Sequence, residues 1–395
     1  LSIAVFTWIL RKEGYCVDLF DTTHYRENEL ASPQNRVKFL QARDIFSDKN
    51  LKLCSAESMK KDFAEKIRAF KPGLILYSFT EDALRRTLEL LRVSNEFHIP
   101  TVLGGVLATA DPEWLISFPE ISMIGVGEGE ETVKTIASRI EKKEPLTEVP
   151  NLWIKMSDGS IQKNACGDYV NLDSYSTDFS LFEEGRLERP MGGKIHRCLP
   201  IETYRGCPYI CTFCNSPMHN RLAKAHNRVF LRRRSIPSIR QEIEHLRNEY
   251  GINLLYFVDD SFLARPRKEI DDFIGMYREF KIPFWFNTRP ENCSLDILQK
   301  LKAVGLFRVS FGIESGNETF RKKHLKRYLS NKELLGYFDI INESGISYSI
   351  NYILGFPHET RSIVFDTIRF AKLIKGYDAI TVSIFTPYRG TALRS

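Results

Sequence analysis

Three cysteines within one short stretch constrain this chain more than any other sequence feature. Residues 205–217 read Arg-Gly-Cys-Pro-Tyr-Ile-Cys-Thr-Phe-Cys-Asn-Ser-Pro and place Cys207, Cys211 and Cys214 in a C-x3-C-x2-C spacing. A tight loop with this spacing turns three thiolates toward a common centre, and thiolates are the ligands of iron-sulfur clusters. The loop itself contains no fourth cysteine. Three protein ligands on a four-iron cluster would leave one iron open to a small molecule, as catalytic metals keep an open position.

The cysteine loop resembles that of the radical S-adenosylmethionine (SAM) enzymes, which carry an aromatic residue just before the last cysteine. Phe213 holds that position here. The resemblance implies a 4Fe-4S cluster whose open iron binds the amino and carboxylate groups of SAM. One electron then splits the sulfonium and gives a 5′-deoxyadenosyl radical. Two other interpretations stay open: a zinc knuckle with a fourth ligand such as His219, or cysteines that are simply small core residues.

Composition places the chain among globular proteins. Its 395 residues exceed one ordinary core, so we expect two or three domains. No apolar run approaches the roughly 18 residues of a membrane span. Eight cysteines at irregular spacing, with no visible signal peptide, favour a reducing compartment and hence a cytoplasmic location.

The net charge of +6 is unevenly distributed along the chain. No acidic residue occurs from Asn215 to Ile239, although this stretch holds Arg221, Lys224, Arg228, Arg232, Arg233 and Arg234. Such a run usually forms a solvated face. A phosphate-bearing ligand or a nucleic acid is the alternative, and we do not expect nucleic-acid binding.

Helical and strand patterns alternate through the first 144 residues. The alternation predicts an α/β fold, an open, doubly wound, Rossmann-like sheet with a ligand crevice at the carboxyl ends of its strands. Because the chain opens on a helical pattern, we expect a first strand upstream of residue 1. The expected helices are 1–12, 81–97 and 132–141, and the expected strands are 16–20, 73–77, 100–103 and 121–126.

This half of the chain resembles the cobalamin-binding domain that precedes many radical SAM cores. The resemblance rests on Asp18-Leu-Phe-Asp21, Ser78-Phe-Thr80, Leu103-Gly-Gly105 and Gly127-Glu-Gly-Glu130. In the similar cobalamin module of methionine synthase, an Asp-x-His-x-x-Gly loop supplies an axial histidine, and that loop would precede the first helix of this chain. His24 follows a different strand and is interpreted as a loop histidine. The resemblance implies that the nucleotide tail of cobalamin binds at the strand ends, which hold Ser78, Thr80, Gly104, Gly105 and Gly127.

Two stretches depart from this alternation. Residues 25–60 are polar and charged, and we expect them to be an insertion. Residues 145–197 are expected to form an irregular linker, apart from a hairpin of strands 152–156 and 160–162. We therefore predict a cobalamin-binding domain over 1–144, the linker over 145–197, and a radical SAM core over 198–395 that is truncated at its C-terminal end.

Beyond the cysteine loop, strands and helices alternate again. One strand before Cys207 and five after it give six βα units, which predict a partial (β/α)6 barrel with function at the strand ends. Radical SAM enzymes have this fold, so the count supports the resemblance. The expected later strands are 253–258, 284–288, 308–313, 347–354 and 379–385, with helices over 236–250, 268–280, 294–303, 331–344 and 361–374.

Polar residues follow several of these strands, where a cofactor would bind. By the same resemblance, Glu314 accepts hydrogen bonds from the ribose or amine of SAM, and Arg327 pairs with the SAM carboxylate. The acidic pair Asp259 and Asp260, after the second strand, is expected to orient SAM or substrate, with a metal pair as the alternative. Gly355 is expected to let the backbone approach the adenine, and Phe213 to belong to the same cofactor site. Structural alternatives exist, because a strand-end glutamate also caps helices and Gly-Phe-Pro is also a turn sequence.

Together these features predict a cobalamin-dependent radical SAM enzyme. We expect it to cleave SAM reductively and to methylate an unactivated carbon of a small molecule or peptide. The expected electron donor is a low-potential flavodoxin or ferredoxin. The alternatives are a cobalamin-dependent radical cyclase or rearrangement enzyme, a tRNA methylthiotransferase, and a non-catalytic zinc or nucleic-acid-binding protein. No side chain is assigned as catalytic.

Overall fold

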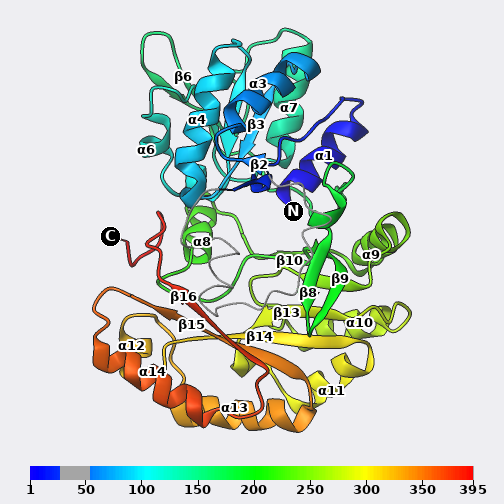
Figure 1. Ribbon diagram of the computed structural model, residues 1–395, viewed down its shortest axis with the longest axis vertical. Coiled ribbons are helices and arrows are strands. Elements are labelled where there is room, and N and C mark those ends of the chain that lie inside the picture. The colour runs from blue at the N-terminus through cyan, green and yellow to red at the C-terminus, as the bar shows by residue number, and fades with distance from the viewer. Residues whose placement is uncertain (27–53, 395) are drawn as a thin grey trace. The chain divides into compact units, whose positions relative to one another are not determined.

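The computed structural model describes residues 1–26 and 54–394 of the chain. It divides the chain into two compact units, Leu1–His196 and Arg197–Ser395 (Figure 1). Most of the expected insertion over 25–60 lies outside the described residues. The two units are described separately below.

The first unit is built on a five-stranded sheet. Its strands β3 (Ile75–Ser78), β4 (Thr101–Gly104) and β5 (Met123–Gly125) are parallel neighbours. The antiparallel hairpin of β6 (Leu152–Lys155) and β7 (Ile161–Lys163) continues the sheet beyond β5, so the order is β3-β4-β5-β6-β7. The predicted hairpin is therefore confirmed.

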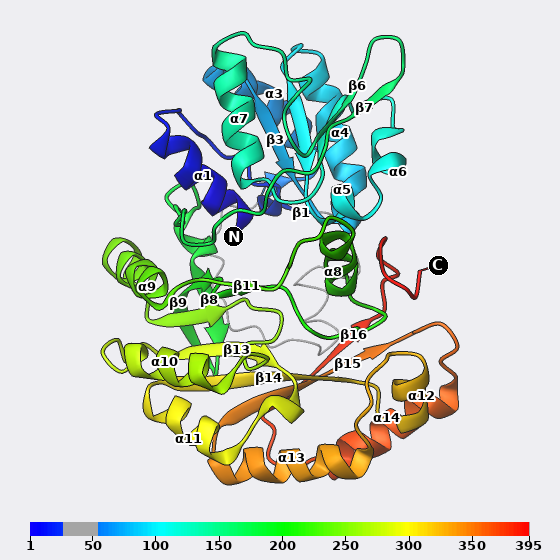
Figure 2. The same ribbon diagram turned by 180° about the vertical axis from the view of Figure 1, so that it is seen from behind.

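Helices cover both faces of this sheet, as Figure 2 shows from behind. Along β4, Leu103 belongs to a buried cluster with α4 (Leu84–Asn95), whereas its neighbour Val102 belongs to a cluster with α7 (Glu130–Glu141). Successive residues of a strand point to opposite faces, so α4 and α7 lie on opposite sides. The predicted doubly wound α/β architecture is confirmed.

One predicted strand is wrong. Residues 16–20, which follow α1 (Ser2–Lys12), belong to no strand among the described residues. A strand exists only through hydrogen bonds to a neighbour, and nearby β1 (Tyr25–Arg26) pairs instead with β2 (Cys54–Ser55). The apolar pattern of 16–20 reflects burial: the Phe20 ring packs on Phe63 with centroids 4.8 Å apart.

A second sheet has the order β16-β15-β14-β13-β12-β9-β8. Apart from β8 (Glu188–Met191) and the first residues of β9, it belongs to the second unit. Its strands from β9 to β16 are all parallel, which confirms the six βα units of a partial barrel. These strands are β9 (Lys194–Ile201), β12 (Leu254–Phe257), β13 (Phe284–Thr288), β14 (Leu306–Glu314), β15 (Ser347–Leu354) and β16 (Ala379–Ile384). The connecting helices line the outer side of the curved sheet (Figure 1), and the main ones are α9 (Ile236–Tyr250), α10 (Arg267–Tyr277), α11 (Leu295–Ala303), α13 (Asn331–Ser344) and α14 (Arg361–Leu373).

Capping residues explain why some predicted helix bounds match the structure. The Ser330 side chain and Glu333 form a capping box at the start of α13, and Gly345 ends that helix in the left-handed conformation with φ of 63°. At α9, the Ser235 side chain caps the start by accepting the Ser238 N–H, and Gly251 ends the helix in the left-handed conformation. Both helices begin and end as predicted because these signals are local in sequence.

Short elements were not predicted. The stretch expected to be an irregular linker contains β8 (Glu188–Met191) and the start of β9. The connections after strand ends contain short helices, α5 (Val106–Ala110), α6 (Pro112–Ile116) and α12 (Glu318–Lys323). Their hydrophobic patterns are too short to show a helical period.

Aromatic rings fill the core between the barrel strands and the outer helices. The Phe257 ring is fully buried, and its centroid lies 5.1 Å from that of Phe262, 5.3 Å from Phe273 and 5.4 Å from Phe284. Trp285 points to the other face of the sheet, where it stacks on Tyr256 with centroids 3.9 Å apart. The ring cluster around Phe257 therefore joins β12, β13 and α10.

Replacing Phe257 by alanine should lower the free energy of unfolding by about 3–5 kcal/mol, since a fully buried ring leaves a cavity. Urea denaturation followed by fluorescence measures this loss. Phe365→Ala on α14 is the control, because that side chain is 42% exposed; its expected cost is below about 1 kcal/mol. Equal costs for the two variants would contradict the assignment of Phe257 to the core.

Candidate functional site

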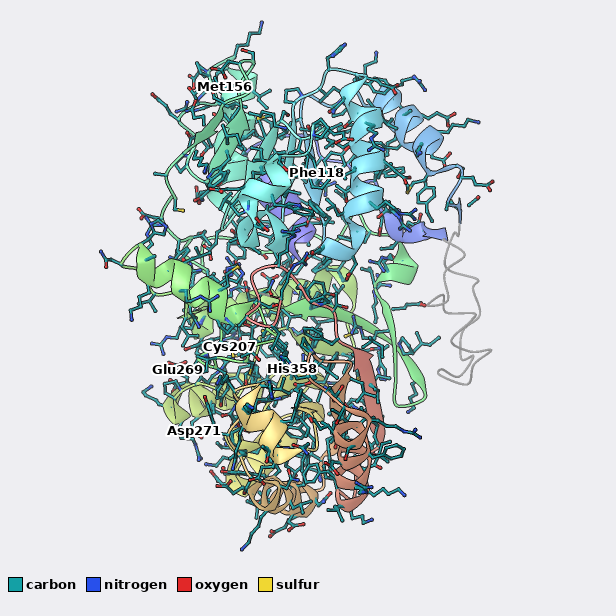
Figure 3. The ribbon with its side chains drawn as sticks, turned by 90° about the vertical axis from the view of Figure 1, so that its left-hand side faces the viewer. Phe118, Met156, Cys207, Glu269, Asp271 and His358 are labelled. Carbon is teal, nitrogen blue, oxygen red and sulfur yellow. The ribbon has the colours of Figure 1, made fainter. Side chains whose placement is uncertain are left out.

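The cysteine loop joins β10 (Tyr204–Arg205) to α8 (Ser216–Ala225) and follows β9, the first strand of the barrel. Its cysteines are free and half-buried, and Figure 3 labels Cys207 in the second unit. Burial raises the pKa of the Cys207 thiol to about 12. Burial also raises the pKa of the Cys211 thiol, although the guanidiniums of Arg327 and Arg289 act against that rise. Such thiols lose their protons on binding a metal rather than to water.

The Asp259 carboxylate holds the chain just before the cysteine loop. One carboxylate oxygen accepts the backbone N–H of Thr203 at 2.8 Å and that of Tyr204 at 3.0 Å. The other accepts the Thr203 hydroxyl and the Arg265 guanidinium. Asp259 is only 2% exposed. Its oxygens are thus engaged by the protein, and its predicted contact with SAM or substrate stays a prediction.

Asp260 holds the chain just after the loop. Its carboxylate accepts the Ser216 hydroxyl at 2.6 Å. Ser216 in turn accepts the Cys214 thiol, with 3.6 Å between sulfur and oxygen. Two successive aspartates at the end of β12 therefore hold opposite ends of the cysteine loop. Sequence reasoning placed both at this strand end but did not find their partners.

Glu314 and Arg327, which the sequence assigns to SAM, lie together. The Arg327 guanidinium donates to Glu314 Oε1 at 2.8 Å, and their side chains are only 7% and 12% exposed. Burial raises the pKa of Glu314, and Arg327 acts against that rise. The Glu314 carboxylate lies where a side chain at Gly312 would be, so a larger residue there would displace the carboxylate. The structure brings these two predicted residues together beside Cys211, whose pKa responds to both.

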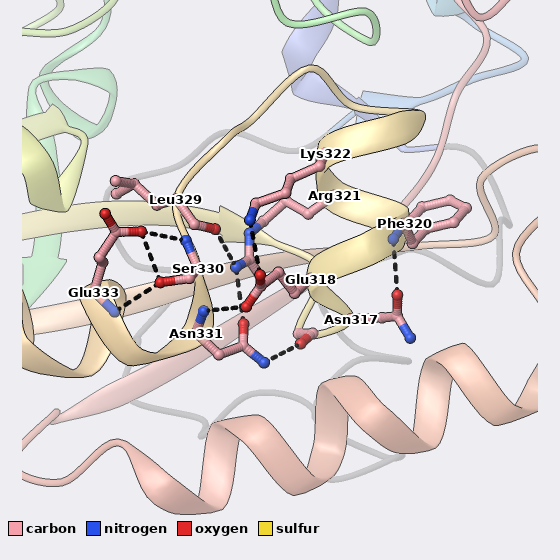
Figure 4. A network of polar contacts seen from close by, with 10 residues as sticks. Asn317, Glu318, Phe320, Arg321, Lys322, Leu329, Ser330, Asn331 and Glu333 are labelled. Atoms are coloured by element: carbon pink, nitrogen blue, oxygen red, sulfur yellow. Dashed lines mark hydrogen bonds and ion pairs between the residues drawn. The ribbon is translucent and has the colours of Figure 1, made fainter.

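Arg321, which was not predicted, holds the segment that carries Arg327 (Figure 4). Its buried guanidinium donates to the carbonyls of Ser315 and Leu329 and to the Asn331 side chain, each at 2.8 Å. Its carbonyl accepts the Arg327 N–H at 3.1 Å. Burial lowers the pKa of Arg321 to about 10. In sequence it belongs to the run Arg321-Lys-Lys323, which is typical of a solvated face and gives no signal of burial.

A small cavity lies among these charged groups. Its lining includes Arg289, Glu291, Gly312, Arg321 and Arg327. The Arg289 guanidinium lies 3.8 Å from the centre of the Tyr209 ring and 2.6 Å from Glu291. The Nε atoms of Arg289 and Arg321 are buried and have no hydrogen-bond partner among the described residues. Buried guanidinium N–H groups of this kind are suited to a carboxylate.

Phe213 and Gly355 lie in one apolar corner of the second unit. The Phe213 ring is 5.8 Å from that of Phe356, and both pack with buried Phe320 and Leu325. Gly355 has φ of 88°, a left-handed conformation that favours glycine, and donates its N–H to Glu359 at 2.5 Å. The packing aligns the loop after β15 with the residue that precedes Cys214.

In the first unit, the predicted cobalamin residues lie at the carboxyl ends of adjacent parallel strands. Ser78 at the end of β3 is the register partner of Gly104 at the end of β4. Exposed Thr80 precedes a short helical turn, and exposed Gly127 follows β5 and donates its backbone N–H to the Thr109 hydroxyl at 2.8 Å. The structure therefore brings these residues to one edge of the sheet.

The two adjacent glycines at this edge differ. A side chain on Gly104 would have Tyr77 O as its nearest neighbour, at 4.0 Å. A side chain on Gly105, where φ is 119°, would lie 2.6 Å from Phe79 O. Gly105 is thus required by the fold, whereas Gly104 leaves open a place that a bound group can use.

Two other sequence candidates also have positions in the structure. His24, interpreted as a loop histidine, ends a short helical turn with its ring nitrogens 3.7 Å from Asp21 and 3.9 Å from Glu183. His219, the possible zinc ligand, stacks on Phe230 with ring centroids 4.8 Å apart. Within the described ranges, no three His, Cys, Asp or Glu side chains converge on a single metal ion. A 4Fe-4S cluster binds each thiolate to a different iron, and three thiols on one loop are a donor set that fits it.

Comparison with known protein families finds two domains in the chain. The radical SAM superfamily model matches residues 201–371, and the B12 binding domain model matches residues 39–137. An uncharacterised methyltransferase of Pyrococcus horikoshii is 26% identical over 84% of this chain and 71% of its own length. An anaerobic magnesium-protoporphyrin IX monomethyl ester cyclase of Cereibacter sphaeroides is 26% identical over 84% of this chain and 54% of its own length.

Among solved structures, the radical SAM methyltransferase TsrM of Kitasatospora setae, with cobalamin and a 4Fe-4S cluster bound, has the same fold. It has a TM-score of 0.63 and 18% identity, over 85% of this chain and 66% of TsrM. This chain thus spans only about half to seven tenths of the length of these proteins.

These findings define the chain as a radical SAM enzyme with a B12-binding domain. It belongs to the family of cobalamin-dependent radical SAM enzymes, as the sequence motifs predicted. The cofactors of that family are a 4Fe-4S cluster, SAM and cobalamin. No helix in the described part of the chain is long and apolar enough to cross a membrane.

Replacing Gly104 by leucine should weaken cobalamin binding roughly tenfold or more, about 1.4 kcal/mol, while the unit stays folded. Equilibrium binding and thermal unfolding of the full-length protein measure the two effects. Gly105→Ala is the matched comparison, because its strain should cost about 1–3 kcal/mol of stability. Unchanged cobalamin binding in Gly104→Leu would remove Gly104 from the cofactor site.

Proposed function

We propose that this protein methylates an unactivated carbon of a small-molecule or peptide substrate. The observation that carries the proposal is the three-cysteine loop after the first barrel strand, in one chain with a B12-binding sheet. When bound, the cluster, SAM and cobalamin supply the electron, the 5′-deoxyadenosyl radical and the methyl group. The protein's own share is to hold these groups, orient them and exclude water.

In this proposal Cys207, Cys211 and Cys214 hold the cluster. Their support is chemical, since the three are free, half-buried thiols on one loop whose two ends are held by Asp259 and Asp260. A thiolate ligand must give up its proton, so the positive charges of Arg289 and Arg327 near Cys211 help to keep it ionised.

SAM is proposed to bind at the charged groups beside the loop. The guanidiniums of Arg327 and Arg289 suit the SAM carboxylate, and Glu314 suits its ammonium or ribose hydroxyls. Gly355 lets the backbone approach the adenine, and Phe213 supports the loop through its contact with Phe356. The support is that these groups are buried, carry both signs of charge, and include unpartnered Arg289 Nε.

Cobalamin is proposed to bind at the strand ends of the first unit. Ser78 and Thr80 offer hydroxyls to its nucleotide tail, and Gly104 and Gly127 let that tail approach the backbone. Gly105 maintains the backbone conformation at this edge of the sheet, because it allows the close approach of the Phe79 carbonyl. The support is the exposure of these residues at one edge and the open place beside Gly104.

Radical SAM chemistry also requires an external one-electron reductant. We propose a low-potential flavodoxin or ferredoxin for that role, and a reducing, cytoplasmic setting that suits free thiols. Nucleic-acid binding is not proposed. Part of the basic segment is internal: Arg234 is 6% exposed and lies 3.5 Å from Glu242, and Arg233 pairs with Glu269.

A radical cyclisation is the second candidate. The cyclase of Cereibacter sphaeroides aligns with 84% of this chain at 26% identity, the same values as the methyltransferase of Pyrococcus horikoshii. Product mass separates the two, since methylation adds one methyl group and cyclisation adds none.

Anaerobic reconstitution of the full-length protein should yield about four irons and one cobalamin per chain. Metal analysis and the visible spectrum measure both at once. Iron without cobalamin would still be consistent with a radical SAM enzyme, but it would rule out methyl transfer from cobalt. Zinc without iron would overturn the proposal.

Replacing Cys211 by alanine should abolish cleavage of SAM, because the cluster would lose one of its protein ligands. Formation of 5′-deoxyadenosine in the presence of dithionite measures this cleavage, and iron content is determined alongside. Cys16→Ala is the control, since Cys16 is an exposed free cysteine in the first unit. Deoxyadenosine formation by Cys211→Ala at the rate of Cys16→Ala would refute the cluster assignment.

A further inference from the structure

The hydroxyl of Ser216 lies between a cysteine of the loop and a carboxylate. Its oxygen is 3.6 Å from the sulfur of Cys214 and 2.6 Å from Oδ2 of Asp260. Ser216 is only 8% exposed, so water competes little for its hydroxyl. At 2.6 Å, the hydrogen bond to the carboxylate is short and charge-assisted.

A serine hydroxyl has one proton to donate. Here the Cys214 thiol donates to Ser216, and Ser216 donates to Asp260, so the proton of Ser216 points away from the sulfur. When Cys214 is a thiolate, the sulfur and the carboxylate compete for this proton. The carboxylate has the shorter contact and keeps it. The sulfur then receives no hydrogen bond from Ser216.

Both features of this arrangement act on a cluster in the same direction. The reduction potential of an iron-sulfur cluster depends on the net charge around it and on hydrogen bonds to its sulfurs. Reduction adds one negative charge, which a nearby carboxylate opposes. A hydroxyl that donated to the cysteine sulfur would favour reduction, but here that proton is held by Asp260.

We propose that Asp260, acting through its charge and through Ser216, keeps the reduction potential of the cluster low. This rests on the proposed function, in which Cys207, Cys211 and Cys214 hold the cluster. The redox step is the uptake of one electron by the cluster from an external low-potential reductant, with no bond formed or broken in the protein. A lower potential makes the reduced cluster a stronger one-electron reductant. Asp260 is thus a positioning and tuning residue, whereas the hydrogen bonds of Asp259 anchor the chain before the loop.

The test is a redox titration of the reconstituted full-length protein without SAM, with dithionite as reductant and the reduced cluster followed by its paramagnetic resonance signal. Asp260→Asn removes the charge and replaces the carboxylate by a neutral amide oxygen, a weaker acceptor, so the thiolate sulfur competes better for the Ser216 proton. We expect the ratio of reduced to oxidised cluster at a fixed potential to rise about tenfold, a positive shift of about 59 mV for one electron.

Two further variants separate the contributions of charge and hydroxyl. Ser216→Ala keeps the Asp260 charge, so its potential should stay close to that of the wild type. The double variant Ser216→Ala/Asp260→Asn loses the charge but has no hydroxyl to donate, so its shift should be smaller than that of Asp260→Asn. Asp272→Asn is the matched control, because this α10 aspartate is a solvent-exposed carboxylate that pairs with Lys268; it should cause no shift.

The possible outcomes are distinguishable. A wild-type protein without a 4Fe-4S signal contradicts the proposed function itself. A normal cluster whose potential is the same in Asp260→Asn and Asp272→Asn overturns the tuning role and leaves the proposed function intact. If Asp260→Asn takes up no iron, Asp260→Ser is titrated in its place. Loss of iron in both variants also overturns the tuning role, because the carboxylate would then be required to hold the loop.

Discussion

The hydrogen bonds that Asp259 accepts are the interaction on which the candidate site depends. Residues 206–215 form no helix or strand, so the cysteine loop has no backbone ladder of its own to hold it. Asp259 accepts the N–H groups of Thr203 and Tyr204, and Arg265 offsets the buried charge. Without this carboxylate, buried donors would be left unpaired. Through Asp259, the end of β12 thereby fixes one end of the irregular cysteine loop to the parallel sheet.

Charge is arranged asymmetrically around that loop. Asp260 lies at Ser216 and Cys214, whereas Arg289 and Arg327 act on Cys211. Burial makes these charges matter, because opposite charges interact more strongly where water is excluded. A cluster on the loop would therefore have the Asp260 carboxylate near Cys214, and two guanidiniums with one carboxylate, Glu314, near Cys211. The guanidiniums of Arg289 and Arg327 are suited to bind an anionic ligand. The Asp260 carboxylate would lower the reduction potential of a bound cluster and so make its reduced form a stronger reductant.

The sequence predicted those parts of the fold that depend on local signals. Helix α13 begins and ends as expected because Ser330, Glu333 and Gly345 act within a few residues of one another. The strand predicted over residues 16–20 was wrong because a strand forms only by pairing with a neighbouring strand, and the pattern of a single stretch does not show whether one is present. For the same reason, only part of the candidate site could be predicted from the sequence. The three cysteines share one local motif, whereas Arg321 and Asp260 have partners that are distant in sequence and come near only in the folded chain. Arg321 looked like a surface charge in sequence, and Asp260 was placed only at a strand end; their partners come from tertiary contacts.

Glu314 shows how the fold aims a side chain that sequence alone places only at a strand end. The register between β14 and β15 shifts between Gly312 and Glu314, and such an irregularity redirects the following side chain. Glu314 itself has φ of 69°, a left-handed conformation that costs a non-glycine residue free energy. The Arg327 ion pair and the absence of a side chain on Gly312 hold it there. Residues held in strained backbone conformations cluster at ligand-binding sites, where the strain orients a side chain. The strain at this buried carboxylate beside the cysteine loop is therefore explained by ligand orientation rather than by stability.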